Sequence, residues 1–172
     1  QDAADRTGFP HGIVAEADLR DPGVEQILER HCSFANMRGV RDFSYGDYLV
    51  EPEFHRGFAL LESYNLIASI AVQWHEMEKL RALAARFPNI PIVVDHTGFP
   101  TERSDEYLQK WKQGVVTASL ADNVWWKISG LGMGDNRWSV DSIRPYVLHS
   151  VDTFGPERCF FASNWPVDWL FS

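Results

Sequence analysis

The sequence has few cysteines and no long hydrophobic run. Its two cysteines, Cys32 and Cys159, lack the spacing of a zinc site or a redox pair, so we expect buried, reduced thiols of a cytoplasmic protein. No apolar stretch is long enough to cross a bilayer, so we expect no membrane association. The first residues carry neither the basic start nor the apolar stretch of a signal peptide.

Basic residues are also scarce. The chain has 16 Lys and Arg residues against 24 Asp and Glu residues, which gives a formal net charge of −8. Nucleic acids and anionic membrane surfaces require clustered cations, so we expect neither as a partner. Hydrophobic residues make up 45% of the 172 residues and charged residues 23%, a balance typical of a globular protein with one core.

Short apolar runs alternate with amphipathic segments along the whole chain. Apolar runs of this kind predict strands buried in a parallel sheet. The six predicted strands cover residues 12–19, 37–41, 67–72, 90–96, 124–129 and 159–164. The segments between them show helical spacing, and residues 1–8 predict a further helix that ends at Gly8. For the helix starts we expect Pro52 in a first turn, Ser104 and Ser142 as N-caps, and Pro145 in the first turn after Ser142.

This α/β alternation fits two architectures. The strands recur at the interval of the βα unit in a (β/α)8 TIM barrel of about 250 residues. An open doubly wound sheet would give the same alternation, although no glycine-rich phosphate loop follows any strand. The amphipathicity of the helices does not separate the two.

Polar residues stand where the predicted strands end, which is the face of a barrel that carries its chemistry. His96 there can bind a metal or polarise a carbonyl, or it can simply bond to its neighbours. Arg41 suits a substrate carboxylate or carbonyl oxygen, or an ion pair with a nearby carboxylate. The pattern by itself leaves these alternatives open. The residues at the six strand ends are Asp18, Arg41, Gln73, His96, Ser129 and Asn164.

Four motifs in this order resemble those of the amidohydrolase-related hydrolases, the amidohydrolase 2 group. That family contains metal-dependent TIM-barrel hydrolases, among them sugar lactonases and dicarboxylate lactonases. The motifs cover nearly the whole chain and read RGVR at 38–41, VDHTGFP at 94–100, KISGLG at 127–132 and FGPERCFFASNWP at 154–166.

The resemblance implies that residues 1–172 form a partial TIM-barrel domain with about strands three to eight of the eight. We therefore expect a fragment of a protein of about 280 residues. The family's His-x-His pair on strand one would lie outside this chain. A divalent metal, expected to be zinc, would then be bound by His96 together with those histidines. A homo-oligomer is a further expectation, although an oligomer formed by the fragment alone would be suspect, because a partial barrel leaves sheet edges unpaired.

The resemblance also assigns roles to the strand-end residues. His96 would be catalytic, as a metal ligand or a carbonyl-polarising group, and Arg41 would contact the substrate. Gln73 and Ser129 join Arg41 as expected substrate contacts by their position. Asn164 stands where most relatives have an Asp that deprotonates the attacking water. An amide does not accept that proton near pH 7 but can hold the water, and Asp168 offers a carboxylate nearby.

We therefore expect a hydrolase that opens a small-molecule lactone by water attack, with metal assistance as an option. The lactone would derive from a sugar acid or from an intermediate of aromatic degradation. Two alternatives stay open at this point. One is a lyase like the zinc-dependent decarboxylases of the same superfamily, and the other is a barrel that binds a ligand without catalysis.

Overall fold

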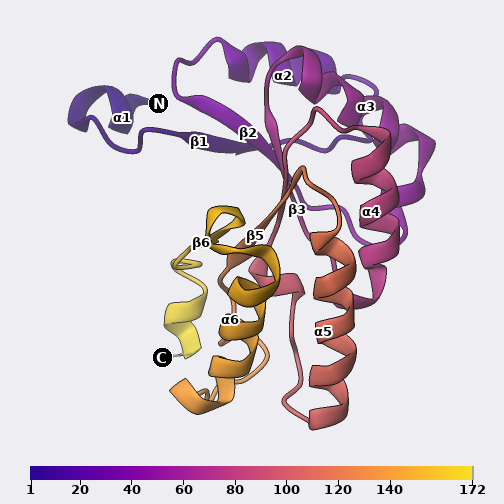
Figure 1. Cartoon of the computed structure of the whole chain (residues 1–172). Helices are drawn as coiled ribbons and strands as arrows, with labels where there is room; N and C mark the ends of the chain where they lie inside the picture. Colours follow the sequence, from indigo (N-terminus) through magenta and orange to yellow (C-terminus); the bar gives the residue numbers. More distant parts are fainter. Residues whose placement is uncertain (172) are drawn as a thin grey trace.

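The protein folds into one curved sheet of six parallel strands with helices on its outer side (Figure 1). The structure, a computed structural model, describes residues 1–171. The strands follow the sequence order β1-β2-β3-β4-β5-β6, and each pairs in parallel with its neighbours. They are β1 (Ile13–Glu16), β2 (Met37–Asp42), β3 (Ile67–Ile70), β4 (Ile92–Val94), β5 (Val124–Ile128) and β6 (Cys159–Phe161).

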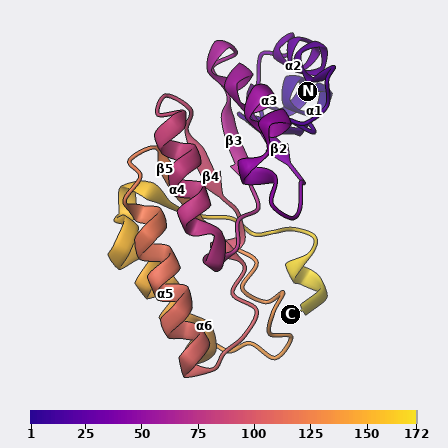
Figure 2. The ribbon, with the colours of Figure 1, turned by 90° about the vertical axis from the view of Figure 1, so that its right-hand side faces the viewer.

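Helices connect the strands in the right order for a barrel. α4, α5 and α6 stand side by side along the sheet (Figure 2). The helices are α1 (Asp2–Thr7), α2 (Val24–Cys32), α3 (Pro52–Ser63), α4 (Met77–Arg86), α5 (Asp105–Ser119) and α6 (Val140–Phe154). Short 3-10 turns complete the chain: η1 (Tyr48–Val50), η2 (Trp74–Glu76), η3 (His96–Gly98), η4 (Pro156–Arg158) and η5 (Asp168–Phe171). The number and order of the predicted strands and the partial TIM barrel are thus confirmed. The predicted ends of β1, β3, β4 and β6 were too late by two or three residues, because the residues there belong to the loops that follow the strands.

Most of the predicted helix boundaries are confirmed. Gly8 follows α1 with a left-handed φ of 71°, and its N–H bonds to the carbonyl of Ala4. Pro52 occupies the first turn of α3, where no N–H is required. The Ser104 side chain accepts a hydrogen bond from the backbone N–H of Tyr107 and so caps α5.

The start of α6 was predicted wrongly. Ser139 is the N-cap, and its hydroxyl accepts from the backbone N–H of Ser142 three residues on. The Ser142 hydroxyl in turn accepts from the backbone N–H of Ser139. Pro145 consequently lies in the interior of the helix, beyond its first turn. Two serines at this spacing satisfy each other, and the sequence alone does not show which of them precedes the helix.

The two faces of the sheet differ in chemistry because side chains alternate along each strand. On the face toward the helices, Val40, Ile70, Val94 and Trp126 are buried in the main apolar core. The alternate positions, on the concave face, include the polar and charged side chains that are described below, beside apolar residues such as Val93 and Trp125. The Trp126 indole N–H donates to the Ser150 hydroxyl of α6, 3.0 Å away, which satisfies its polar group within the core.

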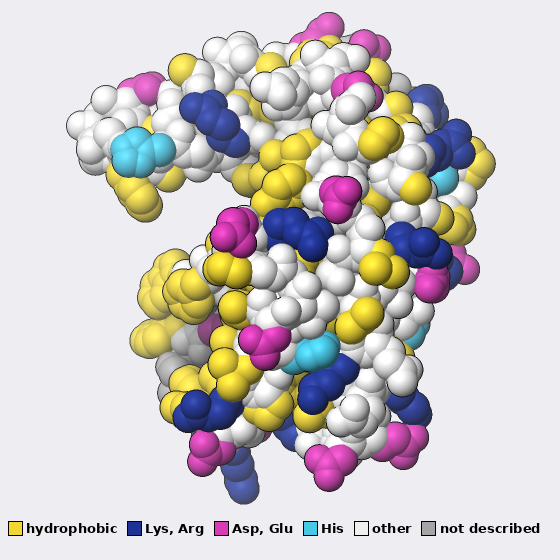
Figure 3. Space-filling view, viewed as in Figure 1, with side chains coloured by type: hydrophobic (Ala, Val, Ile, Leu, Met, Phe, Trp, Pro, Cys, Tyr) yellow, Lys and Arg dark blue, Asp and Glu magenta, His cyan; other side chains and the backbone are white. Residues whose placement is uncertain are grey.

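The barrel is open within the described residues. β1 and β6 are the edge strands, and the space-filling view shows a notch between the arm of α1 and β1 and the C-terminal segment (Figure 3). Phe161, Trp169 and Leu170 expose 80%, 66% and 73% of their surface around β6 and the segment after it. Both cysteines are free and partly buried. No helix within residues 1–171 combines the length and hydropathy needed to cross a membrane.

Candidate active site

Asp95 is the centre of a charged cluster on the concave face. It follows β4 and is fully buried. One carboxylate oxygen lies 2.5 Å from a guanidinium nitrogen of Arg41 on β2. The other lies 2.5 Å from the Lys127 ammonium of β5 and 2.9 Å from the Ser69 hydroxyl of β3. A buried carboxylate requires such partners, and the cluster joins four consecutive strands.

His96 comes next in the chain, and its ring is held between two strand ends. Its Nδ1 lies 3.0 Å from the Ser129 hydroxyl, and its Nε2 lies 3.4 Å from a guanidinium nitrogen of Arg41. Burial lowers the pKa of His96 below its ordinary value, while the charge of Asp95 acts in the opposite direction. The imidazole is therefore neutral near pH 7.

The neighbours of His96 also select its tautomer. Arg41 has only hydrogen-bond donors, so Nε2 is the acceptor in its contact with the guanidinium. The proton then sits on Nδ1 and is donated to the hydroxyl oxygen of Ser129. The Nε2 lone pair consequently points toward Arg41, on the side where a reactant can enter.

The backbone around His96 is unusual. His96, Thr97 and Phe99 all have positive φ values, between 51° and 57°, which L-residues rarely adopt. The Thr97 hydroxyl holds this turn, because it donates to the carbonyl of Ser129 and accepts from the N–H of the same residue. Strained backbone of this kind is kept where the surrounding structure fixes it, and it is common at functional sites.

Gly130 lies close against His96, and we expect its replacement by a larger residue to destabilise the protein. It has a φ of +65°, and a Cβ at this position would lie 2.8 Å from the Cβ of His96. Gly130→Ala should therefore lower the free energy of unfolding by about 2–4 kcal/mol. Gly46→Ala is the control, since Gly46 has a φ of +79° but no atom within 4 Å of the added carbon. Equal losses in urea denaturation of both variants would show that His96 is not crowded.

A cavity of about 430 Å³ brings three of the predicted residues together: Arg41, His96 and Asn164. Its remaining walls are largely apolar. The Arg41 guanidinium also lies 4.5 Å from the ring centre of Phe43, which packs it in a cation–π contact. The wall residues are Phe43, Tyr45, Ala71, Phe99, Met133 and Val167.

The other strand-end residues lie elsewhere. Ser129 does not line this cavity, and it is connected to the site through its contact with Nδ1 of His96. Gln73 lines an adjoining cavity of about 120 Å³ that shares Tyr45, Ala71 and Phe99 with the larger one, and its backbone N–H donates to the Glu76 carboxylate at the end of η2. Asp18 is exposed and bonds to Arg20 within its own turn. The structure thus groups Gln73 and Asp18 with neither His96 nor Arg41, and a substrate contact by Gln73 stays a prediction.

Asn164 is paired with the carboxylate of the loop after β6. Its amide nitrogen donates to Asp168, 2.8 Å away, and contacts the Met133 sulfur at 3.2 Å. Asn164 has a φ of +51°, a conformation that asparagine tolerates better than most residues. The amide oxygen is then the acceptor that Asn164 offers to a water molecule in the cavity.

We expect Asn164→Asp to destabilise the protein in a pH-dependent way. Two carboxylates at this distance repel each other, which raises the pKa of one of them in the folded state. The folded protein then binds more protons than the unfolded chain, so the loss of stability grows as the pH rises from about 4 to 8, to about 1 kcal/mol.

The control exchanges the two residues. Asn164→Asp combined with Asp168→Asn restores one amide and one carboxylate and should recover the melting temperature at pH 8. If Asn164→Asp alone loses no more stability at pH 8 than at pH 4, each compared with the original protein, the contact between residues 164 and 168 is contradicted.

The comparisons with known proteins agree on the family. A family model described as "Amidohydrolase" matches residues 1–170. This chain belongs to the amidohydrolase family. It is 41% identical to the uncharacterised protein y4mH of Sinorhizobium fredii, over all of this chain and 62% of that protein. It is 26% identical to an L-fucono-1,5-lactonase of Burkholderia ambifaria, over 98% of this chain and 60% of the lactonase. The resemblance expected from the motifs is confirmed.

Solved amidohydrolase structures share the fold. Two crystal structures of an amidohydrolase from Burkholderia multivorans, one with bound zinc and one with bound HEPES, each superpose with a TM-score of 0.84 at 27% identity. Each covers 98% of this chain, which in turn covers 63% and 64% of the solved chains. The amidohydrolase chain thus spans less than two thirds of the length of these relatives.

The residues of this amidohydrolase chain do not by themselves fit a zinc ion. Zinc in proteins takes three or four His, Cys or carboxylate ligands. Residues 1–171 contain no group of three such side chains close enough to hold a metal. His96 is the histidine of the site, but its Nε2 faces the Arg41 guanidinium, and the Asp95 carboxylate is taken up by two cations. We therefore assign no step of the chemistry to a metal.

The charged cluster around Asp95 that holds the amidohydrolase site together was not predicted from the sequence. Asp95 and Lys127 lie within two of the family motifs, yet we assigned roles only to their neighbours His96 and Ser129. A charged residue next to or within an apolar strand was the available signal, because such a residue is rarely buried without a partner. Ser69 carried no such signal.

Proposed function

We propose that the amidohydrolase to which this chain belongs hydrolyses the lactone of a sugar acid. The observation that carries the proposal is the meeting of a neutral His96, the Arg41 guanidinium and the Asn164 amide in one cavity. These groups supply a base, a positive charge and a water-binding group, which together suffice for attack on a cyclic ester. The similarity to L-fucono-1,5-lactonases supports the choice of substrate.

The first step forms the tetrahedral intermediate. Asn164 holds the attacking water, and His96 takes one of its protons on Nε2 as the water oxygen bonds to the carbonyl carbon. The carbonyl oxygen becomes an oxyanion, which the Arg41 guanidinium stabilises. The contact between Nε2 and Arg41 is 3.4 Å, long for a hydrogen bond, so an entering oxygen atom replaces it at little cost.

The second step opens the ring. The bond between the carbonyl carbon and the ring oxygen breaks as the carbonyl re-forms, and the protonated His96 returns its proton to the departing ring oxygen. The product is a hydroxy acid, which releases one proton to solution at neutral pH. Asp95 and Ser129 serve this step indirectly, because they fix Arg41 and the imidazole ring in place.

Charge and wall composition favour a neutral lactone over a dicarboxylate. Arg41 is the one cation among the described residues that line the cavity, so a dicarboxylate would leave one of its carboxylates without a partner. The aromatic rings of Phe43, Tyr45 and Phe99 offer flat apolar faces of the kind that pack against a sugar ring.

The test is proton release from defined lactones. We expect the protein to hydrolyse L-fucono-1,5-lactone or D-glucono-1,5-lactone faster than buffer alone, followed with a pH indicator in weak buffer. The exposed His11→Asn variant is the matched control and should retain full activity. Release of carbon dioxide from a carboxylate substrate would support a lyase instead. Lactone binding with no proton release above the buffer rate would support a binding protein.

A further inference from the structure

Two loops on the carboxyl side of the sheet each supply a wall residue of the candidate site. The loop after η3 begins at Phe99, whose ring packs edge-on against His96 at 5.2 Å between centroids. The loop after β5 carries Met133, which contacts Asn164. Phe99 and Met133 both line the cavity. The positions of these two loops therefore shape part of the cavity wall.

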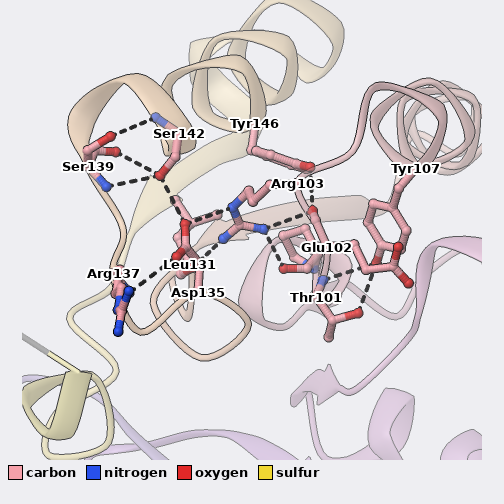
Figure 4. A network of polar contacts seen from close by, with 11 residues as sticks. Thr101, Glu102, Arg103, Tyr107, Leu131, Asp135, Arg137, Ser139, Ser142 and Tyr146 are labelled. Atoms are coloured by element: carbon pink, nitrogen blue, oxygen red, sulfur yellow. Dashed lines mark hydrogen bonds and ion pairs between the residues drawn. The ribbon is translucent and has the colours of Figure 1, made fainter.

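Arg103 joins the two loops (Figure 4). Within its own loop, one guanidinium nitrogen donates to the carbonyls of Pro100 and Glu102, 3.0 and 3.1 Å away. Across the gap, the other donates to the carbonyl of Leu131 at 2.7 Å. Its Nε lies 3.4 Å from the Asp135 carboxylate. A single planar group thus contacts both loops at once, which the guanidinium fork allows.

The partners of Arg103 are themselves anchored to α6. The oxygen of Asp135 that faces Arg103 also accepts from the Ser142 hydroxyl at 3.0 Å. The ring of Tyr146 lies 4.8 Å from the guanidinium, and its hydroxyl donates to the carbonyl of Glu102 at 2.7 Å. The Arg103 and Asp135 side chains are only 19% and 18% exposed, so solvent screens their attraction weakly. The network is therefore more rigid than a surface ion pair.

The loops also touch through their backbones. A Cβ on Gly134 would lie 2.5 Å from the Cα of Thr101, so no side chain fits between the loops there. On the other side, the Tyr107 hydroxyl accepts from the N–H of Thr101 at 3.0 Å and donates to the carbonyl of Phe99 at 3.3 Å. The position of Phe99 is thus connected to Arg103 through a few rigid bonds.

We propose that Arg103 is a positioning residue that fixes the distance between Phe99 and Met133 and thereby determines which ring sizes the cavity accepts. Arg103 does not line the cavity with the reacting groups, so it acts through the walls and not on the bond that breaks. The selection of substrates by ring size rests on the proposed lactone hydrolysis. The connection of the two loops by Arg103 is independent of that proposed function.

The first measurement is amide hydrogen exchange of the whole protein without ligand. In Arg103→Met we expect exchange in both segments, 99–103 and 131–135, to become at least about tenfold faster. Arg137→Met is the matched control, because Arg137 contacts Asp135 only through its backbone N–H, and it should exchange as the original protein does. Asp135→Asn is a milder variant that keeps the shape of the side chain and should accelerate both segments less.

The second measurement is kinetic. We expect Arg103→Met to raise KM for L-fucono-1,5-lactone by about tenfold with kcat changed by less than about threefold, since only substrate positioning is lost. Arg103→Lys should behave like Arg103→Met, because an ammonium group does not contact both loops in the same way.

The loop connection, the positioning role and the proposed function are each contradicted by a different outcome. Faster exchange in only one of the two segments, or wild-type exchange in Arg103→Met, would disprove the connection between the loops. A loss in kcat with unchanged KM, or full rescue by Arg103→Lys, would disprove the positioning role. If the original protein opens neither lactone, the proposed function fails by itself, and the exchange of the two segments still decides whether Arg103 joins them.

Discussion

Asp95→Asn should lower the free energy of unfolding by about 3–5 kcal/mol, the largest stability effect that we expect from a single change. The substitution keeps the shape of the side chain but removes its charge. Arg41 and Lys127, whose side chains are only 22% and 18% exposed, would then face each other without an anion between them. Their repulsion and the lost charge-assisted hydrogen bonds add to one another.

Urea denaturation at constant m-value measures this loss. Asp122→Asn is the matched control, since Asp122 is exposed and the same change there should cost less than about 0.5 kcal/mol. Adding Lys127→Met to Asp95→Asn should recover part of the loss, because it removes one of the two unpaired cations. A loss below about 1 kcal/mol in Asp95→Asn would mean that the cluster is not held by its charges.

His96→Asn should reduce kcat for lactone hydrolysis by about 10²- to 10⁴-fold, the largest effect on activity that we expect. Asparagine keeps a polar group in the site, but it does not accept and return a proton near pH 7. Initial rates of proton release at saturating lactone measure the loss. In the original protein His96 acts as a base in its neutral form. The rate of lactone hydrolysis should therefore fall on acidification only below pH 6.5, the ordinary histidine pKa, because burial lowers the pKa of His96.

Ser129→Ala separates the position of His96 from its chemistry. Ser129 accepts the proton of Nδ1 but does not line the cavity next to Arg41, so its loss should cost only about tenfold in kcat. Retention of more than about a tenth of the activity in His96→Asn would exclude this residue as the proton acceptor.

The sequence by itself determined the elements, their order and the family. Apolar runs separated by helical segments specified six parallel strands, because each run reflects burial on both faces of a sheet. Gly8 and Ser104 marked helix ends through local rules of conformation and capping that do not depend on the rest of the fold. His96 stood out as a polar residue close after a buried strand, and the resemblance of its motif to the amidohydrolases assigned it a role.

Only the tertiary structure decided which side chains meet. The cluster around Asp95 depends on the register of four strands, which brings Ser69, Arg41 and Lys127 to one place from positions up to 86 residues apart along the chain (127 minus 41). Periodicity shows which face of a strand is buried, but it carries no information on which residues of other strands lie beside it. For the same reason the placement of Gln73 in an adjoining cavity, the pairing of Asn164 with Asp168 and the connection of two loops by Arg103 appeared only in three dimensions.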